Sequence, residues 1–121
     1  MARVLVVDDS PSQLMGICRI VQKLGHECLT AEDGAQGVER AKSELPDVIL
    51  MDVVMPGANG FQVTRSIARD PELANVPVII CSSKNQETDK VWGMRQGARD
   101  YIVKPVNAEE LVAKIRAFDP V

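Results

Sequence analysis

Short uninterrupted runs of apolar residues alternate along the chain with longer segments in which apolar residues recur every three or four positions. The runs are typical of parallel strands buried on both faces, and the three-to-four spacing is typical of helices with one buried face. The runs predict strands at residues 3–7, 27–30, 48–51, 78–81 and 101–103. The periodic segments predict helices at about residues 11–24, 34–45, 61–68, 86–96 and 108–118. This alternation predicts an α/β fold, a doubly wound (βα)5 three-layer sandwich whose helices cover both faces of a five-stranded parallel sheet.

Residues that favour helix ends lie at several of these boundaries. Ser10 followed by Pro11 is typical of a helix start, and Gly25 is a typical stop. The helix at 86–96 is the least well specified, because Gly93 costs about 1 kcal/mol of helix propensity relative to alanine. No repeat, linker or low-complexity segment interrupts the alternation, so residues 1–121 are predicted to form a single domain without an output domain.

The composition excludes some classes of partner. Apolar residues make up 45% of the 121 residues and charged residues 26%, which is ordinary for a globular domain. A net charge of −3 and a pI near 5.1 argue against nucleic acid as the main partner, because that role needs a basic surface. No apolar stretch reaches the ~20 residues that span a bilayer, and the N-terminus lacks a signal-peptide pattern. We therefore expect a cytoplasmic protein without membrane insertion.

The cysteines and the single histidine carry no clear site pattern. Cys18, Cys28 and Cys81 are odd in number and form no CxxC pair. Two of them fall in apolar patterns, so we expect buried, reduced thiols rather than metal ligands or redox groups. His26 precedes the second strand, far from the polar residues described next, and receives no role.

Polar residues follow four of the five predicted strands. Asp8 and Asp9 follow the first, Asp52 the third, Ser82 the fourth and Lys104 the fifth. Right-handed crossovers place the carboxyl ends of parallel strands at the same edge of the sheet, where ligands of such folds bind. We therefore expect three carboxylates, a hydroxyl and an ammonium to converge there.

A cation is the simplest way to hold three carboxylates together. Neighbouring carboxylates repel one another and raise each other's pKa unless a positive charge intervenes. Oxygen-only ligation favours a hard ion, and Mg²⁺ suits a site that also admits water and phosphate. Asp52 has no helix behind it to cap, which makes it the candidate nucleophile toward phosphorus, with Lys104 neutralising the phosphoryl oxygens.

Each residue taken singly also has a structural explanation. Asp8 or Asp9 could be an acid that leads a helix, Ser82 a loop hydroxyl, and Lys104 a solvated charge. Asp52 could be a turn former. Their joint occurrence at strand ends on one side of the sheet favours a shared site.

Four segments together resemble the receiver domain of bacterial response regulators, the CheY-like family, over essentially the whole chain. The matching segments are VVDDS at residues 6–10, MDVVMPG at 51–57 with NG at 59–60, SS at 82–83, and GARDYIVKP at 97–105. Each is weak alone, but all four in this order are specific. The resemblance implies the flavodoxin-like strand order 2-1-3-4-5.

The same resemblance implies a role for each acidic residue. Asp52 would be the phosphoacceptor, which receives a phosphoryl group from the phosphohistidine of a histidine kinase. Asp8 and Asp9 would bind Mg²⁺ together with Asp52 and the backbone carbonyl of Val54. The chain would then be a signalling domain that promotes only its own phosphorylation and dephosphorylation.

It also implies how phosphorylation would be read out. Lys104 would pair with the acceptor carboxylate and then with the phosphoryl group, and its bond to Pro105 would be cis. Ser82 would move its hydroxyl onto a phosphoryl oxygen, and Tyr101 would then turn inward. This would reshape the face of helix 4, strand 5 and helix 5, where a downstream target binds, under the added charge of about −1.5 to −2. Alternatively, Tyr101 is a half-buried strand aromatic with a solvated hydroxyl.

Residues 54–62 and 87–101 look like the stand-alone receivers of type IV pilus (twitching-motility) chemosensory systems, of the PilH type. Such a protein would drive output itself or act as a phosphate sink for a sister receiver, with a monomer as the default state. Trp92 would be a partner anchor or a packed surface aromatic.

The sequence disfavours three other functions. An Mg²⁺-dependent aspartyl-phosphate phosphohydrolase is disfavoured because its nucleophile usually lies on the first strand in an Asp-x-Asp pattern beneath a cap. A flavin carrier is disfavoured because Asp9 would repel the phosphate. A degenerate receiver that only docks is disfavoured by the complete set of acids, hydroxyl and lysine.

Overall fold

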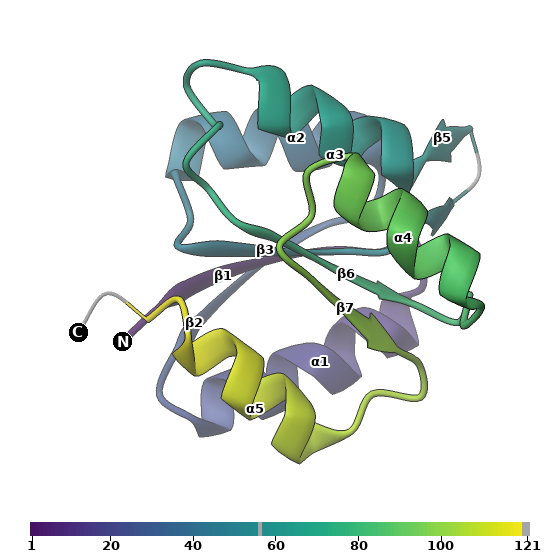
Figure 1. The fold of residues 1–121 in the computed structure, drawn as a ribbon. Coiled ribbons are helices and arrows are strands. Elements are labelled where there is room, and N and C mark those ends of the chain that lie inside the picture. The colour runs from purple at the N-terminus through teal and green to yellow at the C-terminus, as the bar shows by residue number, and fades with distance from the viewer. Residues whose placement is uncertain (56, 120–121) are drawn as a thin grey trace.

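The computed structural model describes residues 1–55 and 57–119. A parallel five-stranded sheet forms its middle layer, with helices on both sides (Figure 1). The elements are β1 (Arg3–Val7), α1 (Pro11–Lys23), β2 (Glu27–Ala31), α2 (Gly34–Glu44), β3 (Val48–Met51), β4 (Val54–Met55), β5 (Ala58–Asn59), α3 (Gly60–Arg69), β6 (Val78–Ser82), α4 (Glu87–Arg95), β7 (Asp100–Val103) and α5 (Ala108–Arg116). The predicted fold class and all ten predicted elements are confirmed, with ends shifted by one or two residues.

The sheet order is β2-β1-β3-β6-β7, and every neighbouring pair is parallel. Counting only the strands of this sheet, the order is 2-1-3-4-5, as the family resemblance implied. β2 lies at an edge, next to β1.

The two faces of the sheet bury different helices. α1 and α5 lie on one side, and α2, α3 and α4 lie on the other (Figure 1). Along β1, Val4 and Val6 belong to the core under α1 and α5, whereas Leu5 and Val7 belong to the core under α2 and α3. This alternation explains why the strands read as continuous apolar runs: both faces of each strand are covered.

A short hairpin was not predicted. β4 and β5 pair antiparallel, Val54 with Asn59 and Met55 with Ala58, where the sequence indicated a loop around Pro56 and Gly57. Pro56 lies outside the described residues. Gly57 has a φ of +70°, which glycine adopts without steric cost. A ladder of two residues per strand is too short to leave a hydrophobic pattern.

Helix α4 keeps its glycine for a packing reason that the sequence did not reveal. A Cβ at Gly93 would lie 2.6 Å from Cδ1 of Ile80 and 3.4 Å from the rings of Phe61 and Tyr101. The helix therefore approaches the sheet so closely that a side chain at residue 93 would require the end of Ile80 to shift. The lower helix propensity is the cost of this close contact.

The expectation of reduced thiols is wrong for two of the three cysteines. Cys18 on α1 and Cys28 on β2 form a disulfide, with Cα atoms 5.6 Å apart. The β1-α1-β2 crossover brings the chain back along itself, so that residues ten apart meet, a spacing that no short cysteine motif signals. Cys81 is free and buried as expected, and burial raises the pKa of its thiol to about 12.

At the other end of the sheet, His26 is buried and its Nδ1 accepts a hydrogen bond from the backbone N–H of Ala2 at 2.9 Å. It therefore lies far from the carboxyl ends of the strands, as predicted, and has a structural hydrogen-bond partner there.

Within the described part of the chain, none of the helices is both long and apolar enough to cross a bilayer.

Candidate functional site

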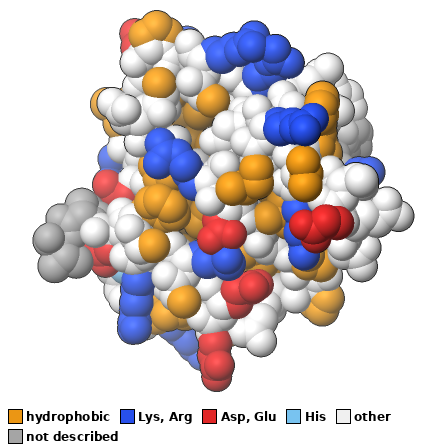
Figure 2. All heavy atoms as spheres, in the orientation of Figure 1, with side chains coloured by type: hydrophobic (Ala, Val, Ile, Leu, Met, Phe, Trp, Pro, Cys, Tyr) orange, Lys and Arg blue, Asp and Glu red, His pale blue; other side chains and the backbone are white. Residues whose placement is uncertain are grey.

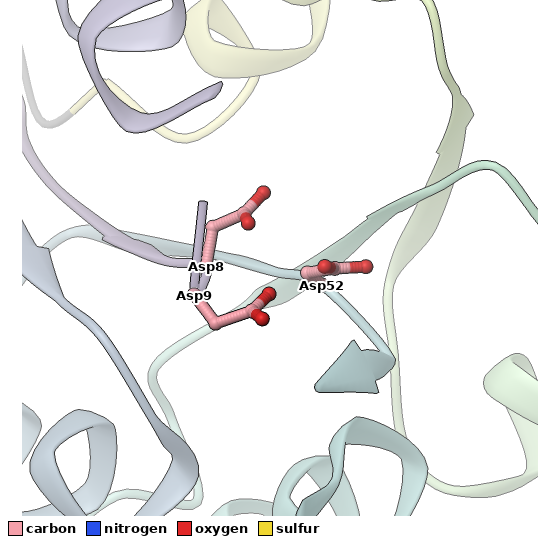
Figure 3. Close-up of side chains that lie close together, drawn as sticks. All are labelled: Asp8, Asp9 and Asp52. Atoms are coloured by element: carbon pink, nitrogen blue, oxygen red, sulfur yellow. The ribbon is translucent and has the colours of Figure 1, made fainter. Parts of the chain in front are cut away.

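Asp8, Asp9 and Asp52 meet where β1 and β3 end. Val7 and Met51 are paired in the sheet, so the residues that follow them, Asp8 and Asp52, emerge side by side. Figure 3 shows the three carboxylates gathered at this edge, two from the end of β1 and one from the end of β3. One oxygen of each lies within 4.8 Å of the others. The predicted acidic cluster is therefore present.

The backbone fixes the two buried acids. Asp52 N–H donates to the Val7 carbonyl at 3.0 Å, and Asp8 N–H donates to the Ala31 carbonyl at 3.0 Å. The side chains accept bonds in turn: Asp8 Oδ1 from Ser10 N–H at 2.9 Å and Asp52 Oδ1 from Val54 N–H at 3.2 Å. Asp8 is 2% exposed and Asp52 6% exposed, whereas Asp9 is exposed. The cluster thus has a fixed inner pair and an outer carboxylate open to solvent.

Lys104 reaches the cluster from the end of β7. Its backbone N–H donates to the Ser82 carbonyl at 2.9 Å, and the Lys104–Pro105 peptide bond is cis, as the resemblance implied. Its Nζ lies 2.6 Å from Asp8 Oδ2 and 3.8 Å from Asp52 Oδ2. The Lys104 ammonium therefore donates its hydrogen bond to Asp8. The expected contact between Lys104 and Asp52 is present, but it is the longer of the two.

Burial and neighbouring charges act in opposite directions on the pKa values of Asp52 and Lys104. Burial raises the pKa of Asp52, and although Lys104 and the Val54 N–H act in the opposite direction, the net shift is upward. Burial disfavours the Lys104 ammonium, but the hydrogen bond to Asp8 and the charge of Asp52 outweigh it, so the pKa of Lys104 is raised. One ammonium thus serves a pocket of three acids, which leaves room for further positive charge.

Ser82 and Tyr101 lie on β6 and β7, the two strands that follow β3 in the sheet. Ser82 is fully buried, and its Oγ accepts the Lys84 N–H at 3.2 Å. The Tyr101 hydroxyl donates to the Lys84 carbonyl at 2.7 Å, and the ring is only 9% exposed. Tyr101 therefore occupies the inward position here and has a protein partner for its hydroxyl. Burial raises the pKa of that phenol.

Val54 contributes backbone rather than side chain. Its side chain is 54% exposed, whereas its N–H holds the Asp52 carboxylate. The role of its carbonyl as a metal ligand stays a prediction.

Gly60 is a site residue whose role the sequence reasoning missed. A Cβ there would lie 2.2 Å from the carbonyl oxygen of Asp52 and 2.5 Å from the Cα of Val53. Its N–H donates to the Val53 carbonyl at 3.2 Å, and Asn59 caps the helix that begins at Gly60. The start of α3 thus packs directly on the backbone of the acidic residue. The Asn59-Gly60 pair was the available signal.

The donor set fits a hard divalent cation. It consists of carboxylate oxygens, one of them on an exposed side chain, and neither a thiol nor an imidazole is among the grouped residues. These residues could hold a metal ion, with open positions for water or a phosphoryl oxygen.

A family model described as the response regulator receiver domain matches residues 4–116. The chain belongs to this family. This assignment agrees with the resemblance seen in the sequence.

Several known proteins are similar over nearly the whole chain. Protein PilH of Pseudomonas aeruginosa is 56% identical over 117 residues, which cover 97% of both chains. PhoB of Escherichia coli, a phosphate regulon transcriptional regulatory protein, is 35% identical, but this chain spans about half, 50%, of its length. The crystal structure of the chemotaxis protein CheY4 of Vibrio cholerae has a TM-score of 0.91 at 31% identity, covering 98% of this chain and 99% of that one.

Proposed function

We propose that Asp52 accepts a phosphoryl group from a histidine kinase in an Mg²⁺-dependent reaction, and that this switches the binding of a downstream protein. The observation that supports it most directly is the buried Asp52 carboxylate, held by the Val54 N–H beside Asp8, Asp9 and the Lys104 ammonium. Membership of the receiver family supplies the reaction class.

In the proposed reaction, an oxygen of Asp52 attacks phosphorus and forms an acyl phosphate as the bond from phosphorus to the imidazole nitrogen of the donor breaks. The imidazole leaves with its electron pair and is protonated by solvent. Bound Mg²⁺ would supply charge neutralisation for the phosphoryl oxygens. Asp8 and Asp9 would hold it together with Asp52 and the Val54 carbonyl.

Lys104 and Ser82 would then read the new group. Lys104 already lies 3.8 Å from Asp52, so its ammonium can leave Asp8 for a phosphoryl oxygen without a backbone shift. Ser82 Oγ accepts the Lys84 N–H, which leaves its own proton for a second phosphoryl oxygen. The move of Ser82 would pull on the loop between β6 and α4, because Lys84 in that loop donates its N–H to Ser82 and accepts the Tyr101 hydroxyl. This would bias the face of α4, β7 and α5 toward or away from a target.

The family assignment favours this signalling role over an aspartyl-phosphate phosphohydrolase, and we propose that the protein performs no turnover on other substrates. Its 56% identity to PilH supports a place in type IV pilus (twitching-motility) signalling. It would act there as a cytoplasmic monomer, as an output regulator or as a phosphate sink for a sister receiver.

Phosphorylation tests the proposal directly. The protein is incubated with Mg²⁺ and acetyl phosphate, and its intact mass is measured. We expect one base-labile phosphoryl adduct, absent from Asp52→Asn and strongly reduced by EDTA. Glu32→Gln, which removes an exposed acid outside the cluster, is the matched control and should be phosphorylated normally.

Release of inorganic phosphate from many phosphoesters without an accumulating adduct would instead favour the hydrolase. The receiver domain of DrrB, whose structure was solved in a BeF3-activated form, has a TM-score of 0.86 at 27% identity, covering 98% of this chain and 97% of that one. BeF3⁻ is therefore a suitable probe here, and it should shift the Tyr101 resonances only when Asp52 is present.

A further inference from the structure

Three arginines and the single tryptophan line a groove between α3 and α4. Arg65 and Arg69 lie on α3, and Trp92 and Arg95 lie on α4, around a space of about 330 Å³. Helix α4 ends at Arg95, and Gly97 just beyond it has a φ of +106°. A Cβ at Gly97 would lie 2.6 Å from Cβ of Ala68. The backbone just after α4 thus contacts α3 at the bottom of the groove, and the arginine side chains lie along its edges.

The groove lies away from the acidic cluster. Helices in this fold run back from the carboxyl edge of the sheet, so the last turns of α3 and α4 lie toward the opposite edge. Figure 2 shows Lys and Arg side chains beside apolar ones over the α3 and α4 region, and most acidic side chains of this view lie below it. The groove shares α4 with the face formed by α4, β7 and α5, but its other wall is α3 rather than β7 or α5.

The three guanidinium groups are not neutralised within the protein. Among residues 1–55 and 57–119, no carboxylate lies within ion-pair distance of Arg65, Arg69 or Arg95. A chain with a net charge of −3 therefore has a locally positive groove. The indole beside it is 49% exposed, although a tryptophan gains much from burial.

Helix dipoles explain part of this pattern but not all of it. Arg69 and Arg95 lie in the last turns of their helices, where a cation is favourable. Arg65 lies in the middle of α3 and gains little from the dipole. The exposed Trp92 gains nothing from it.

We propose that this groove binds an acidic polypeptide segment that presents carboxylates at helical spacing and an apolar side chain to Trp92. Arg65 and Arg69 are four residues apart on one helix face, which matches acids four apart on a facing helix. Arginine and tryptophan are the residues most often found at the energetic centre of such interfaces.

The test uses the tryptophan as a reporter. The full chain is titrated with a glutamate-rich, alanine-based peptide of about 16 residues, long enough to be partly helical. It carries glutamate at every fourth position and a central leucine. We expect the indole N–H resonance of Trp92 to shift and saturate, and a peptide with glutamine in place of glutamate to leave it unchanged.

Charge-matched variants then separate the groove from general attraction. Arg65→Gln/Arg69→Gln/Arg95→Gln should weaken peptide binding about tenfold, as expected for the loss of three exposed ion pairs. The control removes three other exposed arginines, Arg19→Gln/Arg40→Gln/Arg116→Gln, and should stay within about twofold of the wild type. Amide spectra verify that each variant is folded, and the single variant Arg65→Gln replaces the triple if it is not.

Equal weakening in both triple variants would overturn the proposal in favour of nonspecific attraction. Displacement of the peptide by pyrophosphate or a nucleotide at comparable concentration would also overturn it and indicate a small-anion site. None of these results depends on the phosphoacceptor role of Asp52, because the titration uses unphosphorylated protein.

Discussion

The ammonium of Lys104 donates a hydrogen bond to Asp8 at 2.6 Å while it lies 3.8 Å from Asp52. One positive charge therefore stands between two buried carboxylates and favours the one that is not the proposed acceptor. This leaves an oxygen of Asp52 without a direct ammonium hydrogen bond, and so open to an incoming phosphoryl group.

Removal of this lysine should be costly when no metal is present. Lys104→Ala leaves Asp8 and Asp52 as buried, uncompensated charges, so we expect the free energy of unfolding to fall by about 2–3 kcal/mol in EDTA. Mg²⁺ should restore part of this loss, because a cation replaces the missing ammonium. Urea unfolding with and without Mg²⁺ measures both effects, and Lys42→Ala, which breaks a surface pair with Asp70, is the control. A loss that Mg²⁺ leaves unchanged would contradict a shared cation site.

The same variant should separate phosphorylation from switching. We expect Lys104→Ala to accept phosphate from acetyl phosphate to some extent but to bind its target equally in both states. Phosphate incorporation is read by intact mass and target affinity by titration. A normal phosphorylation-dependent change in affinity would refute the role of Lys104 as a reader.

The buried Asp52 should make metal-free stability depend on pH. Burial raises its folded-state pKa above the ordinary 3.8, so the folded protein binds more protons than the unfolded one between the two values. The contribution of Asp52 to stability therefore falls as the pH rises through that window. Asp52→Asn should lack this contribution and should be more stable at neutral pH in EDTA, by about 1 kcal/mol. Unfolding in urea across the pH series checks the slope, and a wild-type slope that Asp52→Asn leaves unchanged would count against it.

Two helical glycines on opposite sides of the sheet should respond oppositely to replacement by alanine. Gly60→Ala places a methyl group 2.2 Å from the backbone oxygen of Asp52, which cannot move without displacing the site. We expect a loss of about 2–3 kcal/mol in unfolding free energy and a lower rate of phosphorylation. Gly16→Ala, in α1 with nothing within 4 Å, should instead gain about 1 kcal/mol. Chemical unfolding of the pair tests this, and equal effects would mean that the packing against Asp52 is unimportant.

The disulfide should make stability depend on reductant. It closes a short loop, with a sequence separation of 10, so reduction should lower the unfolding free energy by about 2–3 kcal/mol. Cys18→Ser should be insensitive to dithiothreitol. Thiol counting in urea should find one free thiol, Cys81, before reduction and three after it. Three reactive thiols in the unreduced protein would show that the bond does not form in solution.

The positions of Asp8, Asp52 and Lys104 at one edge could be predicted because each follows a strong pattern in the sequence. Asp8 and Asp52 follow uninterrupted apolar runs, so their strand positions were readable and the topology rule brought them together. Lys104 could be placed at the same edge for the same reason. Its preference for Asp8 was not predictable, because it depends on a difference of about one ångström between two carboxylates at the same edge.

The features that the sequence did not predict depend on contacts between separate elements. The sequence indicates only that Gly93 weakens its helix, whereas the structure shows that a larger residue there would press on the end of the Ile80 side chain. Cys18 and Cys28 form no recognised short cysteine motif. They become neighbours only because the crossover from β1 through α1 to β2 brings them together. Propensity and periodicity describe each element by itself, so a contact that depends on how two elements approach leaves no trace in them.

Lys84 takes part in two of the bonds described above through its main chain alone: its N–H is held by Ser82, and its carbonyl is held by Tyr101. Substitution of its side chain would therefore leave both bonds in place. The link from the Ser82 hydroxyl to the Tyr101 ring therefore passes through the backbone of residue 84 and does not depend on the identity of its side chain.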